Sequence, residues 1–338
     1  MMTPRDAVPA SGAELTASPP RVVARLRATE PGPTLVVIGG LHGNEPAGLA
    51  AATRMLESLA RAGGPARGEL VVLAGNRRAM ARGVRFVQRD LNRQWTFERL
   101  AELRAAAANP AVVLGPEDRE QLELDDALDL VLREARDRVF VIDLHTTSAE
   151  GIPFALIGDH LRHRRFALEF PLPLLLGLFG QLGGTLTEYL SARRCVTLAV
   201  EGGQHASDRA IANHEAVLSV ALVAAGLLPE PALTGLVAHR QRLVATWPDL
   251  PRALRVHHRH AITPEDRFVM EPGFANVQRV KSGTLLGHDR RGEILAKGDA
   301  VLVMPLYQKM GDDGFFLGHE IPSALFRLGA WVGSLWRR

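Results

Sequence analysis

Short apolar runs that end in polar side chains are the feature that most restricts how this chain can fold. Three such runs cover residues 35–38, 139–142 and 196–200, and stretches with helical spacing lie between them. Runs of four or five apolar residues bounded by turns are typical of strands that are buried on both faces. Strands that alternate with helices predict an α/β fold with a mixed, mainly parallel sheet sandwiched by helices.

Further elements continue this alternation. Strands are also expected at 21–26, 70–73 and 153–157, and helices at 45–61, 116–136 and 205–228. The helix at 116–136 opens with Pro-Glu-Asp, and acidic residues in a first turn suit the helix dipole. The apolar stretch 170–186 is interrupted by prolines and glycines and is short for a bilayer, so we interpret it as a buried loop or pocket wall.

The sequence changes in character after Leu228. Four prolines between 229 and 251 mark a linker, and from Ala253 onward short strand-like segments alternate with glycine turns. This pattern predicts a flexible leader at 1–20, a larger α/β domain at 21–245 that holds the chemistry, and a smaller all-β domain at 250–338. Residues 323–336 are expected to form a short amphipathic helix that packs on the core.

Composition argues against several classes of partner. The formal charge is +3, and the basic residues are spread along the chain without any long block of like charge. We therefore expect no nucleic-acid partner and no basic membrane-binding patch. The single cysteine, Cys195, allows no internal disulfide and no thiolate metal site. With no signal-peptide pattern at the N-terminus, the chain is expected to be cytoplasmic.

Two of the apolar runs lead directly into metal-ligand residues. His42 and Glu45 form a His-x-x-Glu motif just after the run at 35–38, and His145 follows the run at 139–142. Two imidazole nitrogens and one carboxylate are ligands of hydrolytic zinc sites, which keep a fourth position open for water. Ligands of open α/β sheets bind at the carboxyl ends of the strands. We therefore expect one zinc ion per chain, bound by these three residues.

A candidate general base follows the third run. Glu201 ends the run at 196–200 and precedes two glycines. A charged residue directly after a buried strand is unfavourable unless it is paired or functional. We therefore interpret Glu201 as the base that takes a proton from water, and the alternative is a structural salt bridge.

The segment 85–93 carries candidate substrate anchors. Arg93 presents a planar fork of donors that matches a carboxylate, and Asn92 adds an amide donor beside it. Asp90 is interpreted as a residue that contacts and orients a metal ligand or an arginine without binding the metal itself. The alternative interpretation of this arginine-rich segment is a solvated loop.

Taken together, these motifs resemble the succinylglutamate desuccinylase/aspartoacylase family, which has a zinc carboxypeptidase-like fold. The resemblance rests on His42-Gly-Asn-Glu45, Arg85, Asp90-Leu-Asn92-Arg93, Asp143-Leu-His145-Thr-Thr147 and Glu201-Gly-Gly203. Their order and spacing match from about residue 34 to residue 225. The β-rich tail resembles the C-terminal domain of the family, which caps the active site.

The resemblance implies that the chain hydrolyses the amide bond of an N-acyl amino acid, with water activated by zinc and a glutamate base. His42, Glu45 and His145 would bind the zinc ion. Glu201 would act as general base and acid, and Arg85 would polarise the scissile carbonyl.

The resemblance also implies the residues that bind substrate. Asn92 and Arg93 would hold the carboxylate of the amino acid, and Tyr307 would reach the substrate from the C-terminal domain. Aspartoacylases place a further arginine about ten residues before the catalytic glutamate, where this chain has Ser191. Arg193 and Arg194 are the neighbouring candidates for that role. The family also makes a homodimer a reasonable expectation.

Two alternative functions remain open at this point. The same zinc ion and glutamate would serve a carboxypeptidase or an amidase that acts on small peptides. A binding module that keeps the fold without catalysis is the alternative of a different class. The presence of all the metal ligands, the base and the carbonyl-polarising arginine argues against that second alternative.

Overall fold

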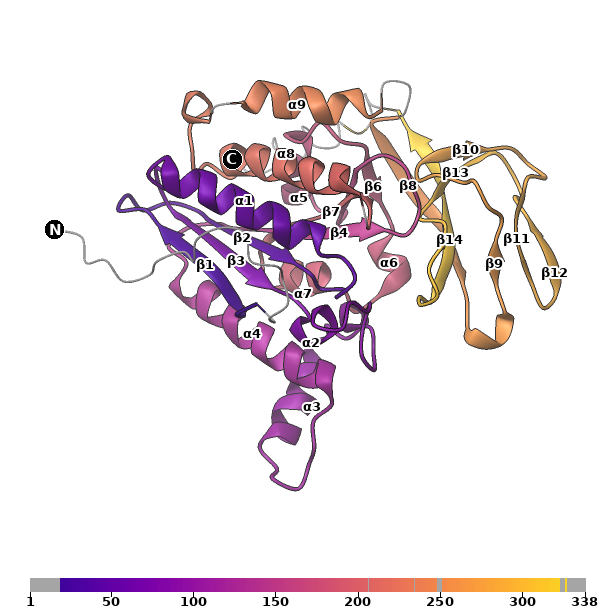
Figure 1. The fold of residues 1–338 in the computed structure, drawn as a ribbon, viewed down its shortest axis with the longest axis horizontal. Coiled ribbons are helices and arrows are strands. Elements are labelled where there is room, and N and C mark those ends of the chain that lie inside the picture. The colour runs from indigo at the N-terminus through magenta and orange to yellow at the C-terminus, as the bar shows by residue number, and fades with distance from the viewer. Residues whose placement is uncertain (1–18, 206, 234, 248–250, 323–325, 327–338) are drawn as a thin grey trace.

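The computed structural model describes residues 19–205, 207–233, 235–247, 251–322 and 326 (Figure 1). Among these residues, eleven strands form one sheet in the order β1-β3-β2-β4-β7-β5-β6-β8-β14-β13-β10, and β12, β11 and β9 form a second, small sheet. The strands of the first half are β1 Val22–Arg27, β2 Thr34–Gly39, β3 Glu69–Ala74, β4 Val139–Thr147, β5 Phe154–Ile157, β6 Leu174–Leu176 and β7 Val196–Gln204. Those of the second half are β8 Ala253–Ala261, β9 Val269–Met270, β10 Gln278–Val280, β11 Leu285–Asp289, β12 Gly292–Leu295, β13 Ala300–Val303 and β14 Asp313–Ile321.

The centre of the large sheet is parallel, as the alternating pattern predicted. Strand β2 pairs in parallel with β3 and β4, β4 pairs in parallel with β7, and β6 pairs in parallel with β5 and β8. The exceptions are the edge strand β1, which runs antiparallel to β3, and β5, which runs antiparallel to β7. The predicted mixed, mainly parallel sheet is therefore confirmed.

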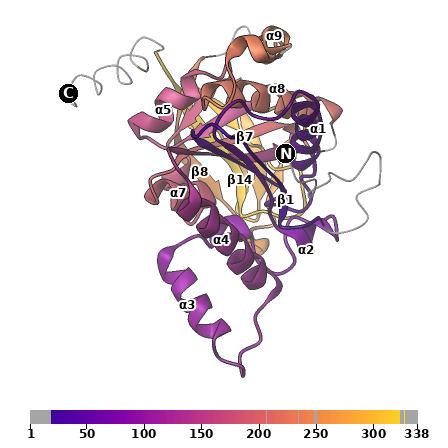
Figure 2. The same ribbon diagram turned by 90° about the vertical axis from the view of Figure 1, so that its left-hand side faces the viewer.

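Helices cover both faces of this parallel part. Helices α1 (Ala47–Arg61), α8 (Asp208–Ala224) and α9 (Leu236–Ala245) lie on one face, and α4 (Pro116–Glu134) and α7 (Leu186–Ala192) lie on the other (Figures 1 and 2). Alternate side chains of β2 face the two layers, so Leu35 and Val37 join the core below α1 and α8 while Val36 and Ile38 join the core below α4. A strand buried on both faces is continuously apolar for this reason.

Several short helices had no clear signal in the sequence. These are α2 Arg77–Met80, α3 Phe97–Ala107, α5 Leu161–Leu168 and α6 Phe179–Leu182, besides α7 and α9. Helix α9 occupies part of the stretch expected to be a linker. The predicted leader lies almost wholly outside the described residues, and so does the predicted helix at 323–336. No described helix is long and apolar enough to cross a membrane.

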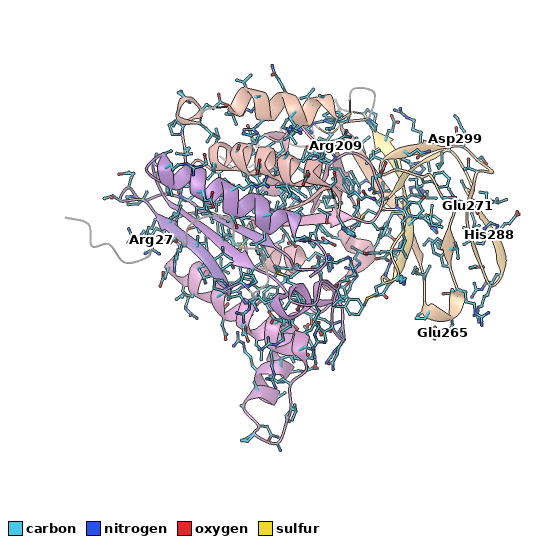
Figure 3. The ribbon with its side chains drawn as sticks, in the orientation of Figure 1. Arg27, Arg209, Glu265, Glu271, His288 and Asp299 are labelled. Atoms are coloured by element: carbon cyan, nitrogen blue, oxygen red, sulfur yellow. The ribbon has the colours of Figure 1, made fainter. Side chains whose placement is uncertain are left out.

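The β-rich C-terminal part continues the large sheet. Strand β8 pairs with β6 of the α/β part and with β14, so β8, β14, β13 and β10 extend the sheet beyond its parallel centre. The small sheet packs on this extension through a separate apolar cluster that includes Met270, Leu286 and Phe315. Labelled charged residues such as Glu265, His288 and Asp299 lie on this side of the molecule, and Arg27 lies at the opposite end of the sheet (Figure 3). The predicted domain boundaries stay predictions.

One buried carboxylate organises the loop that carries the candidate substrate anchors. Glu117 lies in the first turn of α4 and is only 2% exposed. Its two carboxylate oxygens accept hydrogen bonds from the backbone N–H groups of Val87 (2.7 Å) and Gln88 (3.0 Å), and one oxygen also accepts from Asn76 Nδ2 (3.2 Å). The loop at 85–93 is therefore tied to a helix rather than free in solvent.

We predict that Glu117→Ala destabilises the fold. The substitution removes the acceptor of the Val87 and Gln88 N–H groups and of the buried Asn76 amide, so the free energy of unfolding should fall by about 1–3 kcal/mol. Urea unfolding would measure the loss. Glu102→Ala is the control, because the Glu102 side chain is 71% exposed and lies 3.8 Å from its arginine partner. Equal, small losses in the two variants would contradict the role given to Glu117.

Candidate active site and metal centre

The backbone brings the three candidate metal ligands to one edge of the sheet. His42 and Glu45 lie in the turn between β2 and α1, and His145 lies in β4, the strand beside β2. The turn is tight because α2 packs against it. A Cβ atom at Gly43 would lie 2.2 Å from the backbone carbon of Ala79, so the middle of the His-Gly-Asn-Glu motif has room only for glycine.

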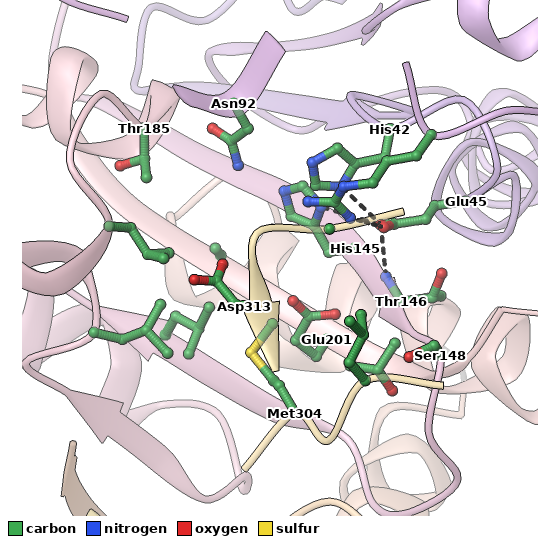
Figure 4. Close-up of a pocket in the computed structure, with 18 of the residues that line it drawn as sticks. His42, Glu45, Asn92, His145, Thr146, Ser148, Thr185, Glu201, Met304 and Asp313 are labelled. Atoms are coloured by element: carbon green, nitrogen blue, oxygen red, sulfur yellow. Dashed lines mark hydrogen bonds and ion pairs between the residues drawn. The ribbon is translucent and has the colours of Figure 1, made fainter. Parts of the chain in front are cut away.

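The carboxylate of Glu45 lies beside the two histidine rings (Figure 4). Glu45 Oε1 is 2.9 Å from His42 Nδ1, and Glu45 Oε2 is 3.1 Å from His145 Nδ1. One ligand atom from each of the three residues can be chosen so that all lie within 4.8 Å of one another. The Nδ1 atom of each ring therefore faces the space where a shared ion would be held.

The opposite nitrogen of each ring faces a second carboxylate. His42 Nε2 is 3.3 Å from Asp90 Oδ1. His145 Nε2 is 2.9 Å from Asp143 Oδ2, at an angle that makes an ion pair rather than a hydrogen bond. Metal-binding histidines commonly have such a partner, which fixes the ring orientation and leaves the other nitrogen for the metal.

The charge of this region fits a bound cation. Four carboxyl groups, those of Glu45, Asp90, Asp143 and Glu201, are each at most 8% exposed. Among the described arginines, Arg85 is the one that pairs with two of them: its Nη2 lies 2.8 Å from Asp90 and its Nη1 lies 3.6 Å from Glu45. Buried negative charge is unfavourable unless it is compensated. A divalent metal between the histidines and Glu45 would supply that compensation.

Two of these carboxyl groups are held in the charged form. Burial alone would raise the pKa of Glu45, but the adjacent His42 and His145 hold this pKa well below its usual range. Burial likewise opposes ionisation of Asp90, and the neighbouring Arg85 and His42 lower the pKa of Asp90 well below its usual value. Both groups are therefore carboxylates at neutral pH.

Glu201 differs from Glu45 and Asp90 because one of its carboxyl oxygens has no hydrogen-bond partner among the described residues. It lies in β7 directly beside His145 of β4, and its Oε2 is buried without a hydrogen-bond partner among the described residues. Burial, reinforced by the nearby charge of Glu45, raises the pKa of Glu201 to about 8. The next residue is Gly202, and a Cβ atom at this position would lie 2.4 Å from Nε2 of His214. The ring of His214 therefore leaves room only for glycine there.

The structure brings the predicted anchors of segment 85–93 into the same pocket. Arg85, Asn92 and Arg93 line it together with the metal ligands and Glu201. Asn92 Oδ1 accepts a hydrogen bond from the Leu186 N–H (2.9 Å), which orients the amide group. Arg93 Nη2 donates to Asp313 Oδ2 (2.8 Å), and its buried Nε has no partner among the described residues.

Three other candidates lie elsewhere. Arg193 forms an ion pair with Asp129 (2.6 Å), and Arg194 lines a second pocket, beside α5 and α7. Neither arginine is among the described residues that line the pocket of the candidate metal ligands. The Tyr307 hydroxyl donates to the Glu271 carbonyl (2.7 Å) and accepts from the Phe274 N–H (2.9 Å), so its ring also stands outside the pocket.

The pocket also contains residues that the sequence did not reveal. Gln308 faces it beside Tyr307 and accepts hydrogen bonds from His205 Nε2 (3.2 Å) and Asn44 Nδ2 (3.1 Å). Asp313, the first residue of β14, points into the pocket with Asn92 and Glu201 (Figure 4). Neither stands in a local motif. The stretch 170–186 does form a pocket wall, as expected, through Leu178, Phe179 and Leu182.

Comparison with known proteins shows which family the catalytic part of the chain is similar to. The sequence-family model of the succinylglutamate desuccinylase/aspartoacylase catalytic domain matches residues 31–189. A curated relative, the succinylglutamate desuccinylase of Pseudomonas fluorescens, is 35% identical over 108 residues, which are 29% of this chain and 31% of that protein. The matched segment thus spans less than a third of the relative.

Solved structures show the same fold. The succinylglutamate desuccinylase of Vibrio cholerae has a TM-score of 0.56 and 19% identity, and the alignment covers 86% of this chain and 82% of that chain. The ectoine utilization protein EutE of Ruegeria pomeroyi, in a product-bound structure, has a TM-score of 0.61 and 20% identity over 87% of each chain. Residues 31–189 thus match the catalytic domain of the succinylglutamate desuccinylase/aspartoacylase family. The family resemblance of the motifs is thereby confirmed.

The ligand geometry predicts how metal binding responds to mutation. His42→Ala and His145→Ala should each lose zinc during dialysis against a mild chelator, because two remaining ligands hold the ion too weakly. His257→Ala removes an exposed histidine of β8 and should keep about one zinc per chain. Elemental analysis measures the difference, and full occupancy in either ligand variant would contradict the assignment.

Proposed function

We propose that this protein is a zinc-dependent hydrolase that cleaves the amide bond of an N-acyl amino acid. The observation that carries the proposal is the free, buried carboxyl oxygen of Glu201 in the pocket that His42, Glu45 and His145 also line. Zinc in such a site polarises a carbonyl and makes water a better nucleophile near neutral pH. The catalytic domain that residues 31–189 match is named for deacylases, which supports the same reaction class.

Glu201 would act as the general base and then as the general acid. Its free oxygen has no competing donor among the described residues, so it is available to a water molecule in the pocket. Burial raises the pKa of Glu201 to about 8, and a group with a pKa near the working pH can both accept and return a proton. The proton taken from water would go to the leaving amine.

Arg85 would stabilise the negative charge that develops on the scissile carbonyl. Its Nε (3.1 Å) and Nη2 (2.8 Å) donate to Asp90 Oδ2, which fixes the guanidinium at the pocket wall. A donor that is already oriented toward developing charge lowers the barrier without reorganising during the reaction. Asp90 thus supports both Arg85 and the ring of His42.

Asn92 and Arg93 would hold the carboxylate of the amino acid. The Asn92 carbonyl oxygen is occupied by the Leu186 N–H, so its amide nitrogen is the group left for a ligand (Figure 4). Arg93 still has an unpaired Nε–H beside it. A guanidinium and an amide together match a planar carboxylate.

The proposal is tested by measuring amine release. Zinc-loaded protein should release free amino acid from some members of a panel of N-acetyl, N-formyl and N-succinyl amino acids. C-terminal cleavage of short peptides is the comparison. Peptide cleavage without release from N-acyl amino acids would replace the proposed reaction by a carboxypeptidase reaction.

Glu201→Gln should separate metal binding from catalysis. The variant should keep its zinc and its fold, since Glu201 is not a ligand in our assignment. Turnover should fall by about 10²–10⁴-fold, as expected when a general acid–base is removed. If the variant loses zinc while Glu45→Gln retains it, the two glutamates have exchanged roles.

Arg85→Ala and Arg93→Ala should give different kinetic signatures. Loss of Arg93 removes an anchor that grips substrate and transition state alike, so KM should rise with little change in kcat. Loss of Arg85 removes a donor to developing charge, so kcat should fall by about 10²–10³-fold. Zinc content of both variants is the control. Near-normal kinetics in both would mean that segment 85–93 does not bind substrate.

A further inference from the structure

Part of the pocket wall is made of apolar side chains. They come from four separate elements and the segment after β6: Leu156 of β5, Leu178, Phe179 and Leu182 around α6, Ala199 of β7 and Phe316 of β14. Most of them also belong to a single apolar cluster. These side chains therefore form an apolar wall in the pocket that the candidate metal ligands and Glu201 also line.

The cations of the pocket are already paired, apart from the Arg93 Nε–H that would bind the carboxylate of the amino acid. Arg85 is bound to Asp90 at 2.8 Å. Arg93 is bound to Asp313 at 2.8 Å, and Arg259 binds the other oxygen of the same carboxylate. Among the described lining residues, Asp312 and Asp313 add negative charge on this side, and no further lysine or arginine lines the pocket.

We propose that the substrate carries a single carboxylate, held at Asn92 and Arg93, and that its other substituent beside the scissile amide is apolar and uncharged. This inference rests on the proposed function, because it names the substrate class of that same site. A second carboxylate would lie against the apolar wall and near Asp313, without a free cation. Burying an unpaired charge in such surroundings is strongly unfavourable.

The apolar group belongs either to the acyl part or to the amino-acid side chain. Matched substrate pairs distinguish the two sources. N-acetyl-leucine and N-acetyl-aspartate have side chains of similar shape and differ in charge on the amino-acid side. N-(4-methylpentanoyl)-glycine and N-succinyl-glycine differ in the same way on the acyl side.

In at least one of these pairs, zinc-loaded protein should prefer the apolar member by about 100-fold in kcat/KM, since a pocket that leaves a charged group unpaired discriminates strongly. The pair that shows the preference identifies which substituent occupies the wall. A preference for the dicarboxylate in either pair, or no preference in both, would overturn the inference while leaving the hydrolase function intact.

Substitutions in the pocket should shift this preference. Leu182 is only partly buried, so Leu182→Arg can place a cation beside the wall without opening the core. It should reduce the apolar preference by about tenfold or more, whereas Leu182→Gln, which adds polarity without charge, should change it much less. Asp313→Asn should also favour the dicarboxylate, because it frees Arg93 from its partner.

Binding measurements keep this inference separate from the reaction itself. Calorimetry on zinc-loaded Glu201→Gln should show tighter binding of the apolar member of the discriminating pair, whether or not the normal protein turns it over. Absence of all turnover together with this binding order would refute the proposed reaction and support the pocket chemistry. Tighter binding of the dicarboxylates would refute the pocket chemistry.

Discussion

The concentration of negative charge at the ends of β2, β4 and β7 is the constraint on which the site depends. These neighbouring parallel strands bring His42, Glu45, Asp143, His145 and Glu201 to one edge of the sheet. Charged carboxylates at such buried positions are unfavourable unless cations lie beside them. The positive charge of Arg85 compensates part of this negative charge. The arrangement of the two histidines with Glu45 is suited to a divalent ion that would compensate the rest.

Most of the surrounding structure serves to hold those charges in place. Asp90 binds both His42 and Arg85, so one carboxylate orients a candidate metal ligand and the proposed carbonyl-polarising group. Glu117 in turn ties the loop that carries Arg85 and Asp90 to helix α4. The Thr146 N–H donates to Glu45 Oε2 at 2.9 Å, which fixes the remaining ligand. The precision of the site thus comes from buried hydrogen bonds that act on its ligands.

The sequence predicted the site best where a candidate functional residue lies at or directly after the end of a strand. The candidate metal ligands and Glu201 could be brought together from the sequence because each stands at or just after the end of an apolar run, and parallel strands end at one edge. Asp313 could not be located, because it lies 220 residues from Arg93 and reaches the pocket only when β14 joins the extended sheet. Tyr307 and Gln308 illustrate the same limit: the two are adjacent, and the backbone direction decides that Gln308 faces the pocket. Glu117 looked like an ordinary residue in a helix first turn, since its loop partners are backbone groups without a sequence signature.

The most direct test of this account is the identity of the atoms that hold the metal. Crystals of the zinc-loaded protein, measured on both sides of the zinc absorption edge, would locate the ion and its ligands. We expect the ion to contact Nδ1 of His42, Nδ1 of His145 and the Glu45 carboxylate, since Asp90 and Asp143 face the Nε2 atoms. An ion held through either Nε2 atom, or bound at another group of residues, would contradict the account.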